Sequence, residues 1–196
     1  MRARFLIMVL IAVLLAPVAA KAVSQETIDQ FVFLLQQPEW DKWDEGVFDD
    51  ATLTEGLDAV YDKAVADADD ILYRRVIWAM GETALPAFVP TLVDSLEDEP
   101  LVACFALGKI SSEDGVNALI GMLDNDDIQV RDAAAWGLGN MLYTDEMKEV
   151  RDDAVSALKA RLDVEEEDWI VEDIQAAITF IETGIAINPA YMESDE

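Results

Sequence analysis

The sequence contains no histidine and only one cysteine among its 196 residues. Without histidine, the chain cannot carry Ser-His-Asp or Cys-His catalysis, or a metal site with a histidine ligand. Cys104 lies in the apolar run 101–107 and has no partner for an internal disulfide, which indicates a small buried core residue rather than a reactive thiol. Ser156 and Lys159 match the Ser-x-x-Lys motif of some serine enzymes, but the sequence contains no companion motif. We therefore predict a non-enzymatic protein with no catalytic residue, no metal site and no cofactor.

Basic residues are also scarce, with 13 Lys and Arg against 41 Asp and Glu, for a formal net charge of −28. A surface of this sign repels nucleic-acid phosphates and anionic lipids, so we expect neither as a partner. Two explanations of the acidity remain open. One is solvation in a salty habitat, favoured because the charge is spread along the chain, and the other is a preference for cationic partners.

The longest apolar run, residues 5–20, has 16 residues and is shorter than the roughly 20 that a membrane-spanning helix needs. Arg2 and Arg4 precede it, and Ala20-Lys21-Ala22 follows as a small-x-small cleavage site. Residues 1–22 are therefore predicted to be a signal peptide, with a retained anchor as the alternative. We expect the cleaved chain to be periplasmic or extracellular, without membrane insertion.

A helical pattern repeats along the rest of the chain, and it is clearest in residues 126–141. Small and apolar residues recur there at Val130, Ala134, Gly137, Leu138 and Met141, the spacing of one buried helical face. Near the end of this helix, Gly139 is expected to form a left-handed cap.

The same pattern predicts alternating first and second helices in successive units. First helices are expected at 71–82, 100–110, 128–141 and 169–182, and second helices near 89–96, 116–123 and 155–162. Helices at 26–37 and 54–67 precede them. The predicted domains are a helical cap or divergent repeat at 23–68, repeats at 69–184 and a flexible acidic tail at 185–196. The expected fold is all-α, a right-handed α-solenoid (α-α superhelix) of stacked antiparallel helix pairs.

Residues 118–141, ALIGMLDNDDIQVRDAAAWGLGNM, join a leucine-rich second helix, an acidic turn, a Val-Arg pair and an alanine run before Leu-Gly. This segment resembles the short HEAT-like repeat found in phycobilin lyases and many bacterial repeat proteins, and the resemblance extends over about residues 70–183. It implies an α-solenoid that binds other macromolecules, without implying one chemistry.

Acidic clusters recur at the turns between units, at 67–70, 97–99, 124–127 and 165–168. Helix capping is the favoured interpretation, because carboxylates satisfy free N–H groups at helix starts. A row of weak calcium sites is the alternative, although residues 124–128 lack the glycine and distal glutamate of a calcium loop.

Three aromatic residues, Trp78, Phe105 and Trp136, take equivalent positions when the units are aligned on their glycines. On a helical wheel, Trp136 lies almost opposite the buried face of its helix. The sequence therefore predicts an aromatic row along the outer wall. The favoured interpretation is that neighbouring helices, or the segment with Trp40 and Trp43, cover this row. Otherwise these five residues form a partner or dimer surface.

These observations together predict an exported, non-enzymatic scaffold or adaptor. Its expected partner is another protein with a basic surface, or else a second copy of the chain. The likeness to phycobilin lyases suggests a different role, that of an accessory lyase-like or modification-enzyme subunit. A cation- or salt-responsive acidic binding protein is the third alternative.

Overall fold

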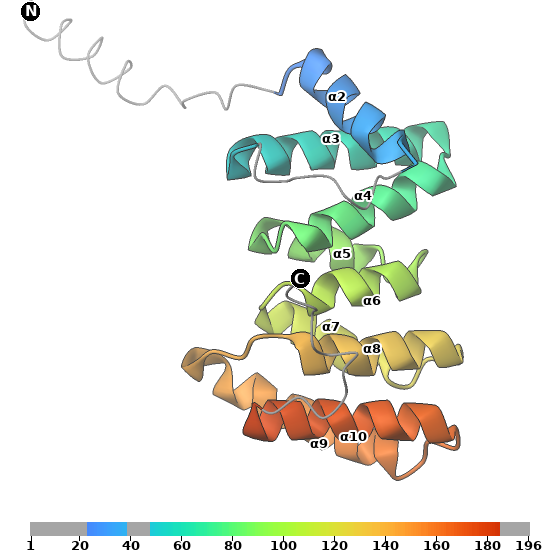
Figure 1. The fold of residues 1–196 in the computed structure, drawn as a ribbon, viewed down its shortest axis with the longest axis vertical. Helices are drawn as coiled ribbons and strands as arrows, with labels where there is room; N and C mark the ends of the chain where they lie inside the picture. The colour runs from blue at the N-terminus through green and yellow to red at the C-terminus, as the bar shows by residue number, and fades with distance from the viewer. Residues whose placement is uncertain (1–22, 39–47, 185–196) are drawn as a thin grey trace, which may run out of the picture.

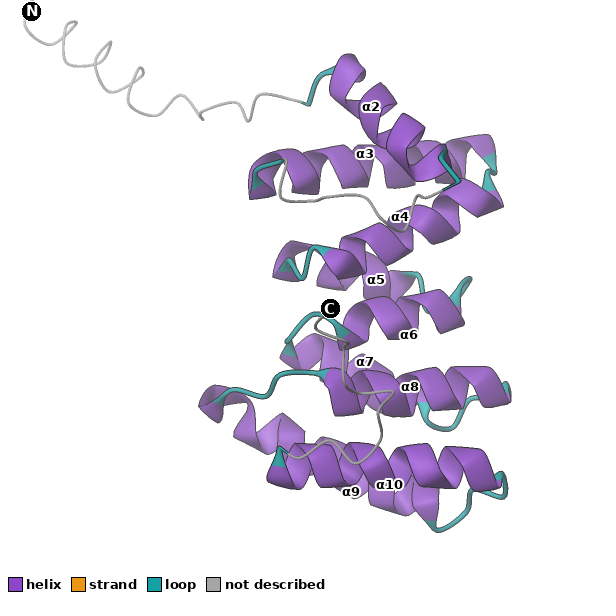
Figure 2. Ribbon diagram, in the orientation of Figure 1, coloured by secondary structure: helices purple, strands orange, loops and turns teal. Residues whose placement is uncertain are grey.

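The computed structural model describes residues 23–38 and 48–184, which form nine α-helices and no strand (Figures 1 and 2). The helices are α2 (Gln25–Gln36), α3 (Asp50–Asp67), α4 (Asp70–Glu82), α5 (Val89–Asp94), α6 (Pro100–Gly108), α7 (Glu113–Met122), α8 (Ile128–Asn140), α9 (Lys148–Leu162) and α10 (Asp168–Thr183). Short 3-10 turns, Pro86–Phe88 and Asp145–Met147, precede α5 and α9.

The helices stack in two layers. The first helices α4, α6, α8 and α10 lie one below another along the long axis of the molecule, and α5, α7 and α9 form a second layer behind them (Figure 1). Each first helix packs against the next, and α5 and α9 both contact α7. Each second helix contacts the first helix of the following unit (α5 with α6, α7 with α8, α9 with α10), and α6 also contacts α7. The helices α2 and α3 continue the stack above α4. The predicted all-α solenoid is confirmed.

The predicted buried face of α8 is confirmed, and burial extends beyond it. Val130, Ala134 and Leu138 are at most 2% exposed, and the neighbouring Ala133 and Ala135 are fully buried. This wider burial follows from the position of α8, which packs against α6, α7 and α10. Small side chains on several faces allow three helices to approach it.

Glycine permits the closest contacts between first helices. A Cβ atom on Gly108 would lie 2.5 Å from the Cα of Gly137, and one on Gly81 would lie 2.6 Å from the Cα of Ala106. The expectation for Gly139 was wrong, because this residue is helical and buried, and α8 ends at Asn140, followed by Met141 in extended backbone. The side-chain amide of Asn140 donates to the Gly108 carbonyl, and Met141 is buried, so both hold the end of α8 against its neighbours.

Acidic residues cap helices at two of the four predicted turns, those before α4 and α8, whereas the residues before α6 and α10 form no side-chain cap hydrogen bond. The side chain of Asp69 accepts from the Leu72 N–H at 3.0 Å, and that of Asp127 accepts from the Gln129 N–H at 2.8 Å. The Asp49 carboxylate caps α3 in the same way, and this cap explains why α3 begins at Asp50, four residues before the predicted start.

The predicted signal peptide (1–22), the acidic tail (185–196), and Trp40 and Trp43 all lie outside the described residues. Within the described ranges, no helix is both long and apolar enough to cross a membrane.

Candidate functional site

The first helices α4, α6 and α8 lie side by side (Figure 1). Their side chains line a groove of about 290 Å³. Its lining residues are Trp78, Glu82, Val102, Phe105, Ala106, Lys109 and Trp136. We call it the aromatic groove. The structure therefore brings together three of the five predicted partner-binding residues, one from each of three successive units.

Two of the aromatic side chains fix each other. The Phe105 and Trp136 ring centroids are 5.1 Å apart with an interplanar angle of 66°, an edge-to-face arrangement that the ring quadrupoles favour. Trp78, Phe105 and Trp136 are each half-buried. Neighbouring helices thus cover part of each ring, as the favoured interpretation expects, and the remaining part lines the groove.

A charged pair borders the aromatic groove. The Lys109 ammonium forms an ion pair with the Glu82 carboxylate, and its Nζ atom lies 6.0 Å from the centroid of the Trp78 ring. The Lys109 and Glu82 side chains are only 28% and 25% exposed. Sequence reasoning missed both residues. The available signal was their position, since each directly follows one of the glycines on which the units align.

The composition of the aromatic groove suits binding. Its walls combine aromatic and aliphatic surface with one anion and one cation. Cys104 is fully buried in α6, as predicted, and is not part of the lining. Burial raises the pKa of its thiol to about 12, which keeps the sulfur protonated and unreactive near neutral pH.

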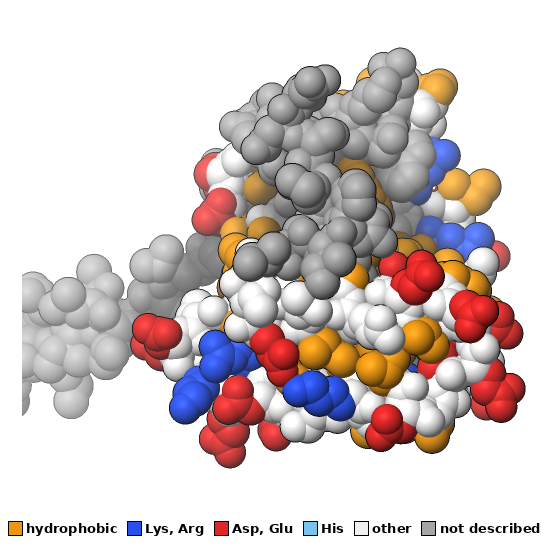
Figure 3. Space-filling view, turned by 60° about the horizontal axis from the view of Figure 1, so that its bottom comes forward, with side chains coloured by type: hydrophobic (Ala, Val, Ile, Leu, Met, Phe, Trp, Pro, Cys, Tyr) orange, Lys and Arg blue, Asp and Glu red, His pale blue; other side chains and the backbone are white. Residues whose placement is uncertain are grey.

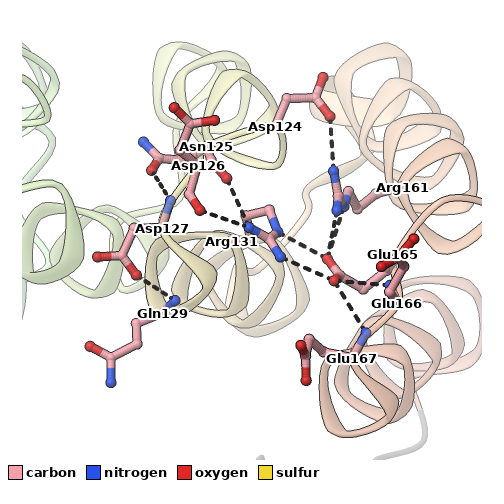
Figure 4. Close-up of polar contacts among 10 residues, drawn as sticks. All are labelled: Asp124, Asn125, Asp126, Asp127, Gln129, Arg131, Arg161, Glu165, Glu166 and Glu167. Atoms are coloured by element: carbon pink, nitrogen blue, oxygen red, sulfur yellow. Dashed lines mark hydrogen bonds and ion pairs between the residues drawn. The ribbon is translucent and has the colours of Figure 1, made fainter.

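The acidic turns before α8 and α10 are joined by two arginines (Figure 4). The Arg131 guanidinium donates to both carboxylate oxygens of Glu165 at 2.9 and 3.1 Å, and to the carbonyls of Asn125 and Asp126. The second arginine, Arg161, pairs with the same Glu165 at 2.8 Å.

The Glu165 side chain is only 1% exposed. Hydrogen bonds from Arg131, joined by those from Arg161, lower the pKa of Glu165 to about 2, although burial acts in the opposite direction. Across the described part of the chain, no three acidic or cysteine side chains gather as they would around a metal ion. At these two turns, Asp127 instead caps α8 and Glu165 pairs with arginine.

An acidic pair, Asp132 of α8 and Asp173 of α10, lies between these two helices. Burial, then the charge of Asp173 and a hydrogen bond with its side chain, raise the pKa of Asp132 to about 6. The Oδ1 atom of Asp132 is buried and has no hydrogen-bond partner among the described residues. Near neutral pH, these two carboxyl groups therefore oppose each other across a helix contact.

The end of the stack formed by α9 and α10 carries a second depression, of about 330 Å³. Figure 3 shows an apolar strip on this end of the molecule, with acidic and basic side chains around it. The depression is lined by Val155 and Ile181 together with the charged residues Arg151, Asp152 and Glu182. With one pair of apolar residues, this surface is less apolar than the aromatic groove.

A family model described as HEAT repeats matches residues 100–179, from the start of α6 into α10. No curated protein matches the chain. The matched residues include Phe105, Lys109 and Trp136 of the aromatic groove, whereas Trp78 and Glu82 belong to the preceding unit, which stacks on them in the same way. The HEAT-repeat resemblance of the sequence is thus confirmed over residues 100–179.

Proposed function

We propose that this chain is an exported, non-enzymatic scaffold that binds another protein through the aromatic groove. HEAT repeats typically serve as protein-interaction scaffolds. The main observation in favour is that Trp78, Phe105 and Trp136 line one half-buried groove, although they come from three different units. Aromatic side chains in partly desolvated pockets contribute most of the binding energy in many interfaces.

The charge of the molecule favours a partner with a basic surface. Acidic residues outnumber basic ones 41 to 13. Several basic residues already hold a carboxylate, as in the Arg74–Glu99 and Lys159–Glu182 pairs, which leaves the surrounding surface anionic. Complementary charge accelerates association and disfavours anionic competitors.

Site-specific crosslinking tests the proposed binding surface. A photoreactive amino acid at Val102, inside the aromatic groove, should crosslink the chain to a defined protein in cells. The same amino acid at Asn117, exposed on α7 in the second layer, is the control and should not. Trp136→Ala should abolish the adduct at position 102. No protein adduct there, or equal adducts at both positions, would contradict the proposal, and an adduct between two copies would identify a homodimer.

Export is supported by the N-terminal pattern of basic, apolar and small residues. In cells that make the full chain, we expect the mature protein to begin after Ala22 and to accumulate outside the cytoplasm. Fractionation followed by N-terminal sequencing checks this expectation. A full-length chain that stays in the cytoplasm would contradict it.

A further inference from the structure

We propose that the aromatic groove recognises a lysine or arginine side chain next to an apolar side chain in a linear segment of the partner. This inference rests on the proposed function and specifies the partner. It depends on the arrangement of Lys109, Glu82 and Trp78, and on the apolar surface beside them.

The position of Lys109 shows that the aromatic groove accommodates a cation. The ammonium group pairs with the Glu82 carboxylate and lies 6.0 Å from the centre of the Trp78 ring. A carboxylate and the face of an indole both attract a cation, and partial burial strengthens both attractions. Among the described residues that line the groove, Lys109 is the one basic residue, so an incoming cation competes with this side chain.

The rest of the lining is apolar. Val102, Ala106 and the Phe105–Trp136 ring pair lie beside the charged pair. A volume of about 290 Å³ is at the lower limit of pockets that enclose small molecules, and it suits a few side chains of a polypeptide. An apolar side chain fits against the rings while its cationic neighbour reaches Glu82.

The overall charge selects the same kind of segment. A net charge of −28 attracts a cationic segment and repels an anionic one. The groove itself holds one anion and one cation, and once Lys109 is displaced an acidic segment would place a carboxylate beside Glu82. The field of the whole protein therefore decides in favour of a cationic segment.

Three synthetic peptides of equal length test this inference by fluorescence anisotropy with the full chain. One alternates leucine and lysine, one alternates leucine and glutamate, and one alternates serine and lysine. We expect the leucine–lysine peptide to bind about tenfold more tightly than the serine–lysine peptide, because only the former has an apolar anchor. The leucine–glutamate peptide should show no binding.

Matched variants localise the effect to the aromatic groove. Lys109→Ala should tighten leucine–lysine binding severalfold, because it vacates the place between Glu82 and Trp78. The control Lys63→Ala removes the same charge from an exposed pair on α3 and should change binding much less. Glu82→Gln should weaken binding about tenfold, more than Glu97→Gln at an exposed position. Thermal unfolding checks that each variant is folded.

Three results would overturn the inference: weaker binding by Lys109→Ala, equal effects of Glu82→Gln and Glu97→Gln, or equal binding of the leucine–glutamate peptide. Crosslinking at Val102 separates this outcome from failure of the proposed function. If a protein still crosslinks there through a segment without lysine or arginine, only the inference fails. If no protein crosslinks, the proposed function fails as well.

Discussion

The two sides of α8 form contacts of different kinds. Toward α6, the backbone of Gly137 meets Gly108 and the Trp136 ring meets Phe105, so these contacts involve no charged group. Toward α10 and the turn before it, Asp132 faces Asp173, and Arg131 pairs with Glu165. Neither of these α6–α8 pairs contains a group that titrates. The strength of the α8–α10 contact, in contrast, depends on the protonation of Asp132 and Glu165. Stability in a solenoid is a sum over such contacts, so it differs along one stack.

Breaking the contact between α6 and α8 should lower the free energy of unfolding the most. In Gly108→Val, the new Cβ would lie 2.5 Å from the Cα of Gly137, a backbone atom that cannot rotate away. We expect a loss of about 3 kcal/mol in the free energy of unfolding, measured in urea. Gly121→Ala is the control, because open space surrounds this helical glycine, and it should stabilise the protein by up to about 1 kcal/mol. Equal stability of the two variants would mean that the helices separate easily.

Breaking the ion pair between Arg131 and Glu165 should lower the free energy of unfolding somewhat less. Arg131→Met leaves the buried Glu165 carboxylate with Arg161 and the N–H groups of Glu166 and Glu167, and it removes two hydrogen bonds to backbone carbonyls. We expect a loss of about 2 kcal/mol, since breaking a buried pair costs more but these partners remain. Lys63→Met breaks an exposed, solvent-screened pair and should change the unfolding midpoint much less. Similar unfolding midpoints for both variants would show that Arg131 contributes little.

Acid should weaken the same ionic contact. Because the folded-state pKa of Glu165 is lowered to about 2, its stabilisation is complete above the ordinary glutamate pKa and is lost as the pH falls toward 2. In Glu165→Gln, we expect lower stability at pH 7 and a smaller loss between pH 5 and pH 2. Unfolding measured across this range checks the prediction, and parallel curves for the two proteins would refute it.

The Asp132–Asp173 pair should respond to pH in the opposite sense, with the smallest effect. Since the folded-state pKa of Asp132 is raised to about 6, the folded state holds this proton more tightly, and stability falls as the pH rises from about 4 through 6. Asp132→Asn should stabilise the protein at pH 8, by on the order of 1 kcal/mol, with little change at pH 4. Destabilisation at pH 8 would indicate that the ionised carboxylate has a favourable partner.

Local features of the structure were predictable from the sequence. The first helices, the acidic caps and the alignment of Trp78, Phe105 and Trp136 follow from spacing within one helix or one turn. The equivalent position in successive units is enough to place the three aromatic residues in a row, because the units stack in register. The groove they form requires the structure, since it depends on how far each ring is covered.

Contacts between units were not predictable in the same way. Arg131 and Glu165 are 34 residues apart, and their pairing depends on how the turns before α8 and α10 approach each other. The Asp132–Asp173 pair likewise depends on the rotation of two helices about their axes. The misplaced cap at Gly139 has a related cause, because this glycine is buried inside α8, which packs against α6, α7 and α10.

Stacking of adjacent helices also has a consequence for folding kinetics. Helices such as α6 and α8 contact each other across a separation of only one intervening helix, so the loops that close during folding are short. Low contact order of this kind goes with fast folding, and a stack of similar units can nucleate at any strong local contact. We expect the glycine contact between α6 and α8 to be one such point.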